Sequence, residues 1–187
     1  MNFVLVLLTA SLAFAEVKEY TIAPAEENRL ELDVDKTGLW KGKRHIFTFA
    51  HYNGKLLYDP QNPAAGKVDL TVEAASIQCQ DAWVSPKDLK KVLEYAVKDM
   101  LAAEKNPEIH FVSTMASAGQ VEGMLTIRGI SKPVTLTYTA KGLRFEGTAV
   151  FKLTDYNLKP PSAALGAIGT KDEMTFRFVV QAIDPQK

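Results

Sequence analysis

The sequence predicts a mainly β protein: an antiparallel β-barrel of about eight strands with one amphipathic α-helix at about residues 86–105. Three observations support this fold class. Apolar and polar residues alternate with a period of two along most of the chain, which indicates strands with one buried face. One stretch changes to the helical period of three to four. Turns rich in glycine and proline join the alternating runs, and a barrel leaves no exposed sheet edge. A β-sandwich is the competing architecture.

The clearest strands lie in a hairpin at residues 121–140. Alternate residues from Val121 to Ile127 share one face, because successive side chains of a strand point to opposite sides. The same alternation returns after a short loop that contains Gly129 and Pro133, with threonines on the opposite face. The stretch is therefore predicted to be an antiparallel hairpin with one apolar face.

The remaining strands are predicted from the same alternation. In the run 44–53, His45 and His51 share the parity of the phenylalanines, so both histidines are expected to point inward. The run 160–169 is apolar without alternation and is expected to be a loop that edges the cavity mouth. Besides the hairpin, the predicted strands cover residues 29–35, 44–53, 55–58, 66–77, 108–117, 142–153 and 173–183.

The helix has a recognisable start and stop. Ser85 is a suitable N-cap, Pro86 suits the first helical position, and Asp88 places a carboxylate three residues after the cap. Apolar residues then recur at helical spacing as far as Leu101, and the Asn106–Pro107 pair ends the pattern. A single helix among strands is expected to pack against the sheet or to close one end of a barrel.

Residues 1–15 are predicted to be a cleaved signal peptide. They form an apolar run that ends in Ala13-Phe14-Ala15, which matches the small-residue cleavage pattern of secretory signals. The run is too short to span a bilayer, and no later run is longer. We therefore expect residues 16–187 to form one periplasmic or secreted domain without stable membrane insertion.

The balance of charge gives no reason to expect nucleic-acid binding, and the cysteine content excludes an internal disulfide. The chain has 22 basic and 22 acidic residues, and this balance gives no electrostatic reason to bind nucleic acid. Cys79 is the only cysteine, so an internal disulfide is impossible, and we expect it to be a small buried residue.

The sequences of several segments resemble those of the YceI-like family of exported, lipocalin-like proteins. The hairpin contains G-x-L-T-I-R-G-I-S-K-P-V-T-L at residues 123–136, which resembles the central signature of the family. D-P-x-N-P at 59–63 and K-N-P-E-I-H-F-V-S-T at 105–114 resemble two further junctions. The resemblance spans nearly the whole mature chain. It implies a lipocalin-like barrel that binds a polyisoprenoid or a similar long apolar molecule.

The candidate ligand site is the inward face of the barrel. Small inward residues, among them Gly123, Gly147 and Ala149, are interpreted as leaving volume that large side chains then line. His45, His51 and Tyr138 are the candidates for polar contacts with a head group. A tapered barrel filled by side chains shows the same pattern, so both interpretations stay open. The predicted cavity-lining residues are Phe47, Phe49, His51, Phe111, Leu125, Leu136, Tyr138, Phe145, Phe151, Phe176 and Phe178.

Three functional classes remain at this point. The first is a carrier of a long isoprenoid lipid, such as a polyprenol derivative or a quinone-like molecule. The second is a non-enzymatic structural or interaction module with a filled barrel. The third, an enzyme, lacks support because the chain has none of the G-x-S-x-G, H-E-x-x-H, C-x-x-C or phosphate-loop motifs. We expect no catalytic residue, metal or cofactor, and a homodimer is compatible with the sequence.

Overall fold

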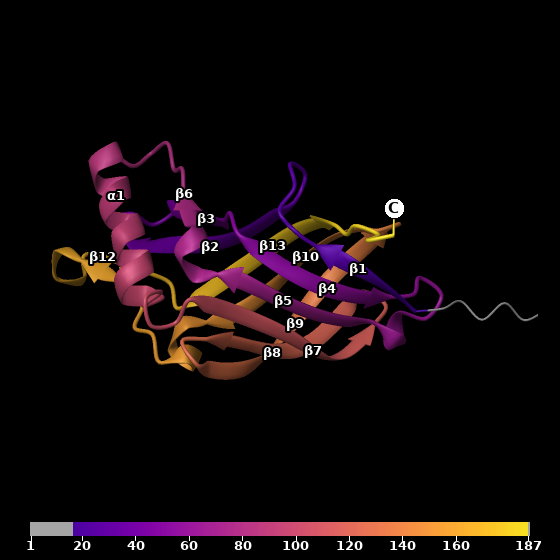
Figure 1. Ribbon diagram of the computed structural model, residues 1–187. Coiled ribbons are helices and arrows are strands. Elements are labelled where there is room, and N and C mark those ends of the chain that lie inside the picture. Colours follow the sequence, from indigo (N-terminus) through magenta and orange to yellow (C-terminus); the bar gives the residue numbers. More distant parts are fainter. Residues whose placement is uncertain (1–16, 187) are drawn as a thin grey trace, which may run out of the picture.

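The computed structural model describes residues 17–186, which fold into one antiparallel sheet of 13 strands and an α-helix (Figure 1). The predicted signal peptide 1–15 lies outside the described residues. The helix α1 covers Pro86–Tyr95. The strands are β1 Lys18–Ile22, β2 Arg29–Gly38, β3 Arg44–Phe49, β4 Tyr52–Tyr58, β5 Lys67–Glu73, β6 Ile77–Cys79, β7 Glu108–Ser117, β8 Gln120–Ile127, β9 Ile130–Lys141, β10 Arg144–Lys152, β11 Ser162–Ala163, β12 Ile168–Thr170 and β13 Glu173–Gln181.

Neighbouring strands follow the order β1-β4-β5-β7-β8-β9-β10-β13-β2, and β3 pairs with both β2 and β6. Thr21 of β1 and Ile183, two residues after the end of β13, exchange two backbone hydrogen bonds of 2.8 and 2.9 Å. This bridge links β1, at one end of the strand order, to the segment that follows β13. The sheet therefore curls back on itself at this end. The curled sheet then encloses its apolar face, as the alternation predicts (Figure 1).

The predicted mainly β fold with one helix is confirmed, and the differences lie in short elements. The predicted strand 66–77 is divided, because a 3₁₀ turn at Ala74–Ser76 separates β5 from β6. The expected loop 160–169 contains the very short strand β11 and most of the short strand β12. Strand β1 has only five residues, and its pattern was too short to be recognised.

The helix begins as predicted and ends earlier. The Ser85 hydroxyl accepts a hydrogen bond from the Asp88 backbone N–H at 3.2 Å, which is the expected N-cap. After Tyr95 the chain widens into a π-helical turn at Ala96–Met100, and Ala102 adopts a left-handed backbone with φ of 47°. The apolar spacing continues past Tyr95, because that turn still packs on the core.

One face of α1 covers an end of the curled sheet (Figure 1). Leu89, Val92 and Leu93 pack with the buried side chains of Phe47, Ile77 and Cys79, so the helix joins the strands β3 and β6. Cys79 is buried, as predicted. Within residues 17–186, no helix has the length and apolar character needed to cross a bilayer.

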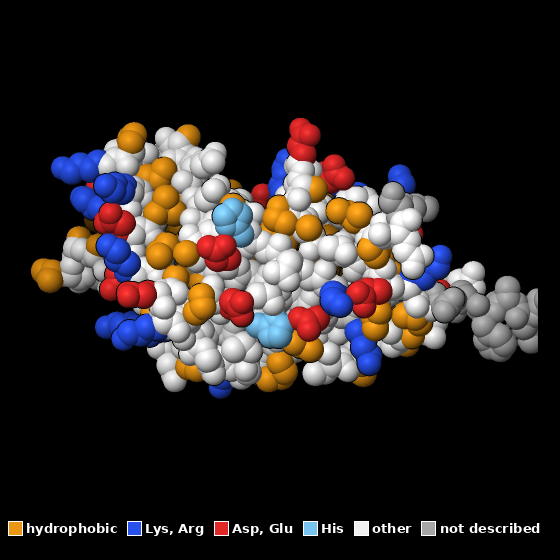
Figure 2. All heavy atoms as spheres, viewed as in Figure 1, with side chains coloured by type: hydrophobic (Ala, Val, Ile, Leu, Met, Phe, Trp, Pro, Cys, Tyr) orange, Lys and Arg blue, Asp and Glu red, His pale blue; other side chains and the backbone are white. Residues whose placement is uncertain are grey.

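The face of the molecule drawn in Figure 2 carries charges of both signs. Basic side chains are most frequent at the end that bears α1, and acidic side chains lie among them. Several apolar side chains are also exposed at the tips of loops, among them Leu39 and Leu165.

Candidate functional site: an apolar cavity

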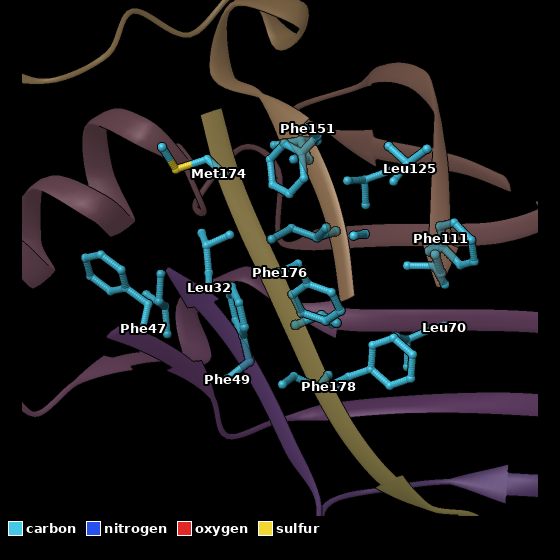
Figure 3. A pocket seen from close by; sticks show the side chains of 18 of the residues that line it. Leu32, Phe47, Phe49, Leu70, Phe111, Leu125, Phe151, Met174, Phe176 and Phe178 are labelled. Atoms are coloured by element: carbon cyan, nitrogen blue, oxygen red, sulfur yellow. The ribbon is translucent and has the colours of Figure 1, made fainter. Parts of the chain in front are cut away.

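A cavity of about 440 Å³ lies within the curled sheet (Figure 3). Its wall is formed by the inward faces of the long strands and by the inner side of α1. This volume is within the range of pockets that hold small molecules and cofactors, about 300–1,000 Å³. Its wall includes Phe47, Phe49, Phe111, Leu125, Leu136, Tyr138, Phe145, Phe151, Phe176 and Phe178, all of which were predicted from alternation.

The register between strands stacks apolar side chains into continuous rows across the wall. Leu32 of β2 is paired with Phe47 of β3 on one side and with Phe176 of β13 on the other. Phe176 and Phe178 are neighbours on one face of β13, and their rings stack with centroids 6.2 Å apart. These rings and Leu32 point into the same space in Figure 3. Period-two alternation is therefore sufficient to build this part of the wall.

Gly123 and Gly147 do not leave open volume beside them as the sequence suggested, because aromatic rings already occupy that space. A Cβ atom at Gly123 would lie 2.4 Å from the ring of Phe111, and one at Gly147 would lie 2.6 Å from the ring of Phe178. Each glycine allows a large ring to lie against the wall. Larger residues at these two positions would therefore collide with rings that belong to the cavity wall.

His51 does not line the cavity, so this predicted site residue is wrong. Its side chain is 69% exposed, and its Nδ1 lies 2.9 Å from Glu73. Strand β3 ends at Phe49, a bend follows at Ala50, and β4 begins with the buried Tyr52. The bend resets the alternation, because two residues lie outside both strands. His51 is therefore turned outward.

His45 lines the cavity and is buried beside an acidic partner. Its Nδ1 donates a hydrogen bond to Asp81 Oδ2 at 2.6 Å, and its ring stacks on Trp83 with centroids 4.8 Å apart. Burial lowers the pKa of His45, although Asp81 opposes this effect. The hydrogen bond with Asp81 fixes the imidazole at the α1 end of the cavity.

His45, Cys79 and Asp81 are the described residues that could together hold a metal ion. Their ligand atoms lie within 4.8 Å of one another. The Cys79 thiol donates to Asp81 Oδ2 at 3.1 Å, and burial raises the pKa of that thiol to about 12. Asp81 Oδ1 accepts a further hydrogen bond from the Ile46 backbone N–H at 3.2 Å. The cluster satisfies itself by hydrogen bonds, and a metal would have to displace the protons of His45 and Cys79.

Tyr138 presents its ring to the cavity while its hydroxyl is engaged elsewhere. The hydroxyl donates to the backbone carbonyl of Ser117 at 3.0 Å. The ring packs against Phe145, with centroids 6.0 Å apart. Tyr138 therefore contributes mainly apolar surface to the wall.

The α1 end of the wall also contains polar residues that the apolar pattern did not identify. Lys36 and Thr170 line the cavity there, near His45. The exposed Lys91 on α1 and the half-buried Pro161 also belong to the wall, so the cavity reaches the surface between the helix and the loop before β11. Lys36 points to the same side of β2 as Leu30, Leu32 and Val34. Alternation along the strand would have identified it if polar residues had been counted as well.

Comparison with known proteins identifies related sequences. A family model for the YceI-like domain matches residues 20–182. A UPF0312 protein of Photorhabdus laumondii is 34% identical over 126 residues, which cover 60% of this chain and 62% of the relative. A UPF0312 protein of Pseudomonas putida is 30% identical over 158 residues, covering 71% and 79%. The protein YceI of Escherichia coli is 32% identical over 126 residues, covering 60% and 62%.

Solved structures share the fold at lower identity. BcnA of Burkholderia cenocepacia aligns with a TM-score of 0.61 and 22% identity, over 81% of this chain and 94% of BcnA. A mutant CJ YceI protein, crystallised with a monobromobimane guest, aligns with a TM-score of 0.57 and 16% identity, over 75% of this chain and 85% of that chain. At these identities the likeness establishes the fold alone.

Proposed function

The chain belongs to the YceI-like domain family, and on this premise we propose that it is a non-enzymatic binding protein that carries a long apolar lipid in its cavity. The lipid class is an isoprenoid derivative or a quinone-like molecule. The observation that supports the proposal is a cavity of about 440 Å³ whose wall consists almost entirely of apolar side chains. Export by the signal peptide 1–15 to the periplasm or the outside of the cell is part of the proposal.

Burial of a hydrocarbon chain is sufficient to drive binding at this site. Each methylene removed from water contributes about 0.8 kcal/mol, so about ten buried carbons supply roughly 8 kcal/mol. This gain is partly offset by the lost freedom of the chain and of the complex, which costs at least about 4 kcal/mol. Affinity is then expected to rise with chain length until the cavity is full.

The structure argues against the two rival functions. A structural module with a filled barrel would have interlocked side chains at its centre, whereas a cavity of about 440 Å³ lies there. An enzyme would bring its ionisable groups together around a reacting atom. The histidines instead bind separate carboxylates, in the pairs His45–Asp81, His51–Glu73 and His110–Asp69.

Organic extraction of the purified protein tests the proposal. The mature chain should be purified from its native compartment without detergent and extracted, and the extract analysed by mass spectrometry. We expect a long-chain lipid in a near-stoichiometric amount. Protein that was stripped by the extraction and refolded should take up added polyprenol in a length-dependent manner. Absence of both a co-purified lipid and uptake would contradict the proposal.

A further inference from the structure

Lys36 is the one residue that interrupts the apolar row of β2 on the cavity side. Leu30, Leu32 and Val34 precede it with the same parity, and all of them line the cavity. Its Nζ donates a hydrogen bond to the hydroxyl oxygen of Thr170 at 3.1 Å. Thr170 is buried and is the cross-strand partner of Lys36 on β12. A positively charged group is thus held at the α1 end of an apolar cavity.

Two tryptophans lie beside the polar residues at this end of the molecule. The Nζ of Lys36 lies 5.8 Å from the ring centroid of Trp40, and Trp40 packs edge-on against Trp83 at 5.6 Å. Trp83 in turn stacks on His45. Burial lowers the pKa of Lys36.

Among residues 17–186, no carboxylate lies within 4.0 Å of the Lys36 ammonium group. The acids nearest in sequence, Asp33 and Asp35, belong to the opposite face of β2 and are ion-paired there with arginine and lysine side chains. Asp81 is engaged by His45 and Cys79. A half-buried charge is normally paired, because desolvation without a partner is costly.

Lys36 also differs from the other lysines of the wall. Lys91 is exposed and forms an ion pair with Asp88 at 3.0 Å. Lys67 is exposed at the start of β5. Only Lys36 combines a half-buried position, a hydroxyl partner and a place on the apolar row.

We propose that Lys36 and Thr170 bind the anionic head group, a carboxylate or a phosphate, of a long-chain ligand whose tail occupies the cavity. This inference rests on the proposed carrier function and narrows the chemical class of the ligand. The ammonium group supplies a point charge for an oxyanion. The Thr170 hydroxyl accepts from Lys36 and keeps its own hydrogen, which it donates to a ligand oxygen.

Ligands that share a tail and differ in the head group test this inference. Dodecanoate, dodecyl phosphate and dodecanol should be titrated into the delipidated mature protein at neutral pH, with calorimetric detection. We expect at least one anionic compound to bind about tenfold or more tightly than the alcohol, because a hydrogen bond to an ionised acceptor is stronger than one to a neutral acceptor. The better anion distinguishes a carboxylate from a phosphate head group.

Variants of Lys36 separate head-group binding from packing of the lysine stem. Lys36→Met keeps the apolar stem and should abolish the preference for the anions over dodecanol. Lys36→Arg should retain the preference. Lys43→Met is the matched control, because Lys43 is an exposed lysine at the other end of the same turn, and it should behave as the unaltered protein.

The outcomes distinguish the two proposals from each other. If none of the three compounds binds the unaltered protein and it takes up no polyprenol either, the carrier function itself is contradicted; if it takes up polyprenol but none of the three, the head-group site is overturned. If the alcohol and both anions bind equally well, or if Lys36→Met keeps the anion preference, the head-group site is overturned and the carrier function stands. In that case the ammonium group of Lys36 only extends to solvent while its stem covers the wall.

Discussion

At the residue scale, glycines decide how the aromatic rings lie. Gly147 faces Phe178 across the pair of β10 and β13, and the ring occupies the place of a side chain. Ala149, two residues further along β10, lines the cavity as a small residue. A change at Gly147 is therefore expected to affect both the sheet and the open space behind it.

Gly147→Ala should destabilise the protein by about 1–3 kcal/mol, in the range of other overpacked sites. The added Cβ would lie 2.1 Å from the backbone oxygen of Thr137 and 2.6 Å from the ring of Phe178. Urea unfolding monitored by circular dichroism measures the change. A variant as stable as the unaltered chain would show that the close contact at Gly147 is not real.

A second residue-scale prediction concerns acid stability. Hydrogen bonds from Arg44 and Lys171 lower the pKa of Asp35 to about 2. A carboxylate with a lowered pKa in the folded state stabilises the protein above its ordinary pKa, and this contribution disappears as the pH falls toward about 2. Asp35→Asn should cost about 1 kcal/mol at neutral pH, because the partly exposed pairs are screened by water.

The cost of Asp35→Asn should shrink toward zero as the pH falls from about 4 to about 2. Urea titrations of both proteins across this interval measure it. A difference in unfolding free energy that is constant with pH would contradict the assigned ion pairs.

At the element scale, α1 connects a local sequence signal to one end of the cavity. Its N-cap, Ser85, also donates to the Asp88 carboxylate at 2.8 Å, so both groups hold the first turn. The helix then packs through Val92 and Leu93 on the end of the sheet. Loss of the cap should therefore destabilise the helix and weaken its packing over the end of the cavity.

Ser85→Ala is expected to lower the unfolding free energy by about 1 kcal/mol, the usual effect of removing an N-cap. Ser85→Asp is the matched control, because aspartate also accepts from the backbone N–H groups of the first turn, and it should keep most of the stability. Thermal unfolding of the three proteins provides the comparison. Equal stability of the alanine and aspartate variants would contradict the role of the cap.

Elements defined by a local pattern were predictable from the sequence, and those that depend on distant contacts were not. The alternation of β2, β10 and β13 is carried by residues two apart, and the cap of α1 by residues three apart. The bend at Ala50 and the early end of α1 at Tyr95 have no comparable local signal, because tertiary packing determines them.

The same distinction applies to the cavity wall. Phe176 and Phe178 were found from parity within one strand. His51 was misplaced, because the bend before it resets the parity. The pairing of His45 with Asp81 joins residues 36 apart in the chain, so no spacing rule could reveal it. Lys36 follows Leu30, Leu32 and Val34 with the same parity, but the apolar alternation that predicts this strand ends at Val34.

At the scale of the whole molecule, the account depends on an open space inside the curled sheet. The wall draws on residues from β1 to β13 and from α1, and the bridge between Thr21 and Ile183 keeps the first strand beside the end of the last. A lipid chain would contact most of these elements together. Its binding should therefore stabilise the folded chain as a unit.

Uptake of a polyprenol by a cavity-filling variant tests this claim most directly. Leu125→Trp adds volume inside the cavity, and Met124→Trp adds it on the outer face of the same strand, where Met124 is 36% exposed. Leu136→Trp is a second filling variant in case the first does not fold. Folded filling variants should lose polyprenol uptake at least about tenfold, while Met124→Trp should match the unaltered protein. Equal uptake by all folded variants would contradict an internal lipid site.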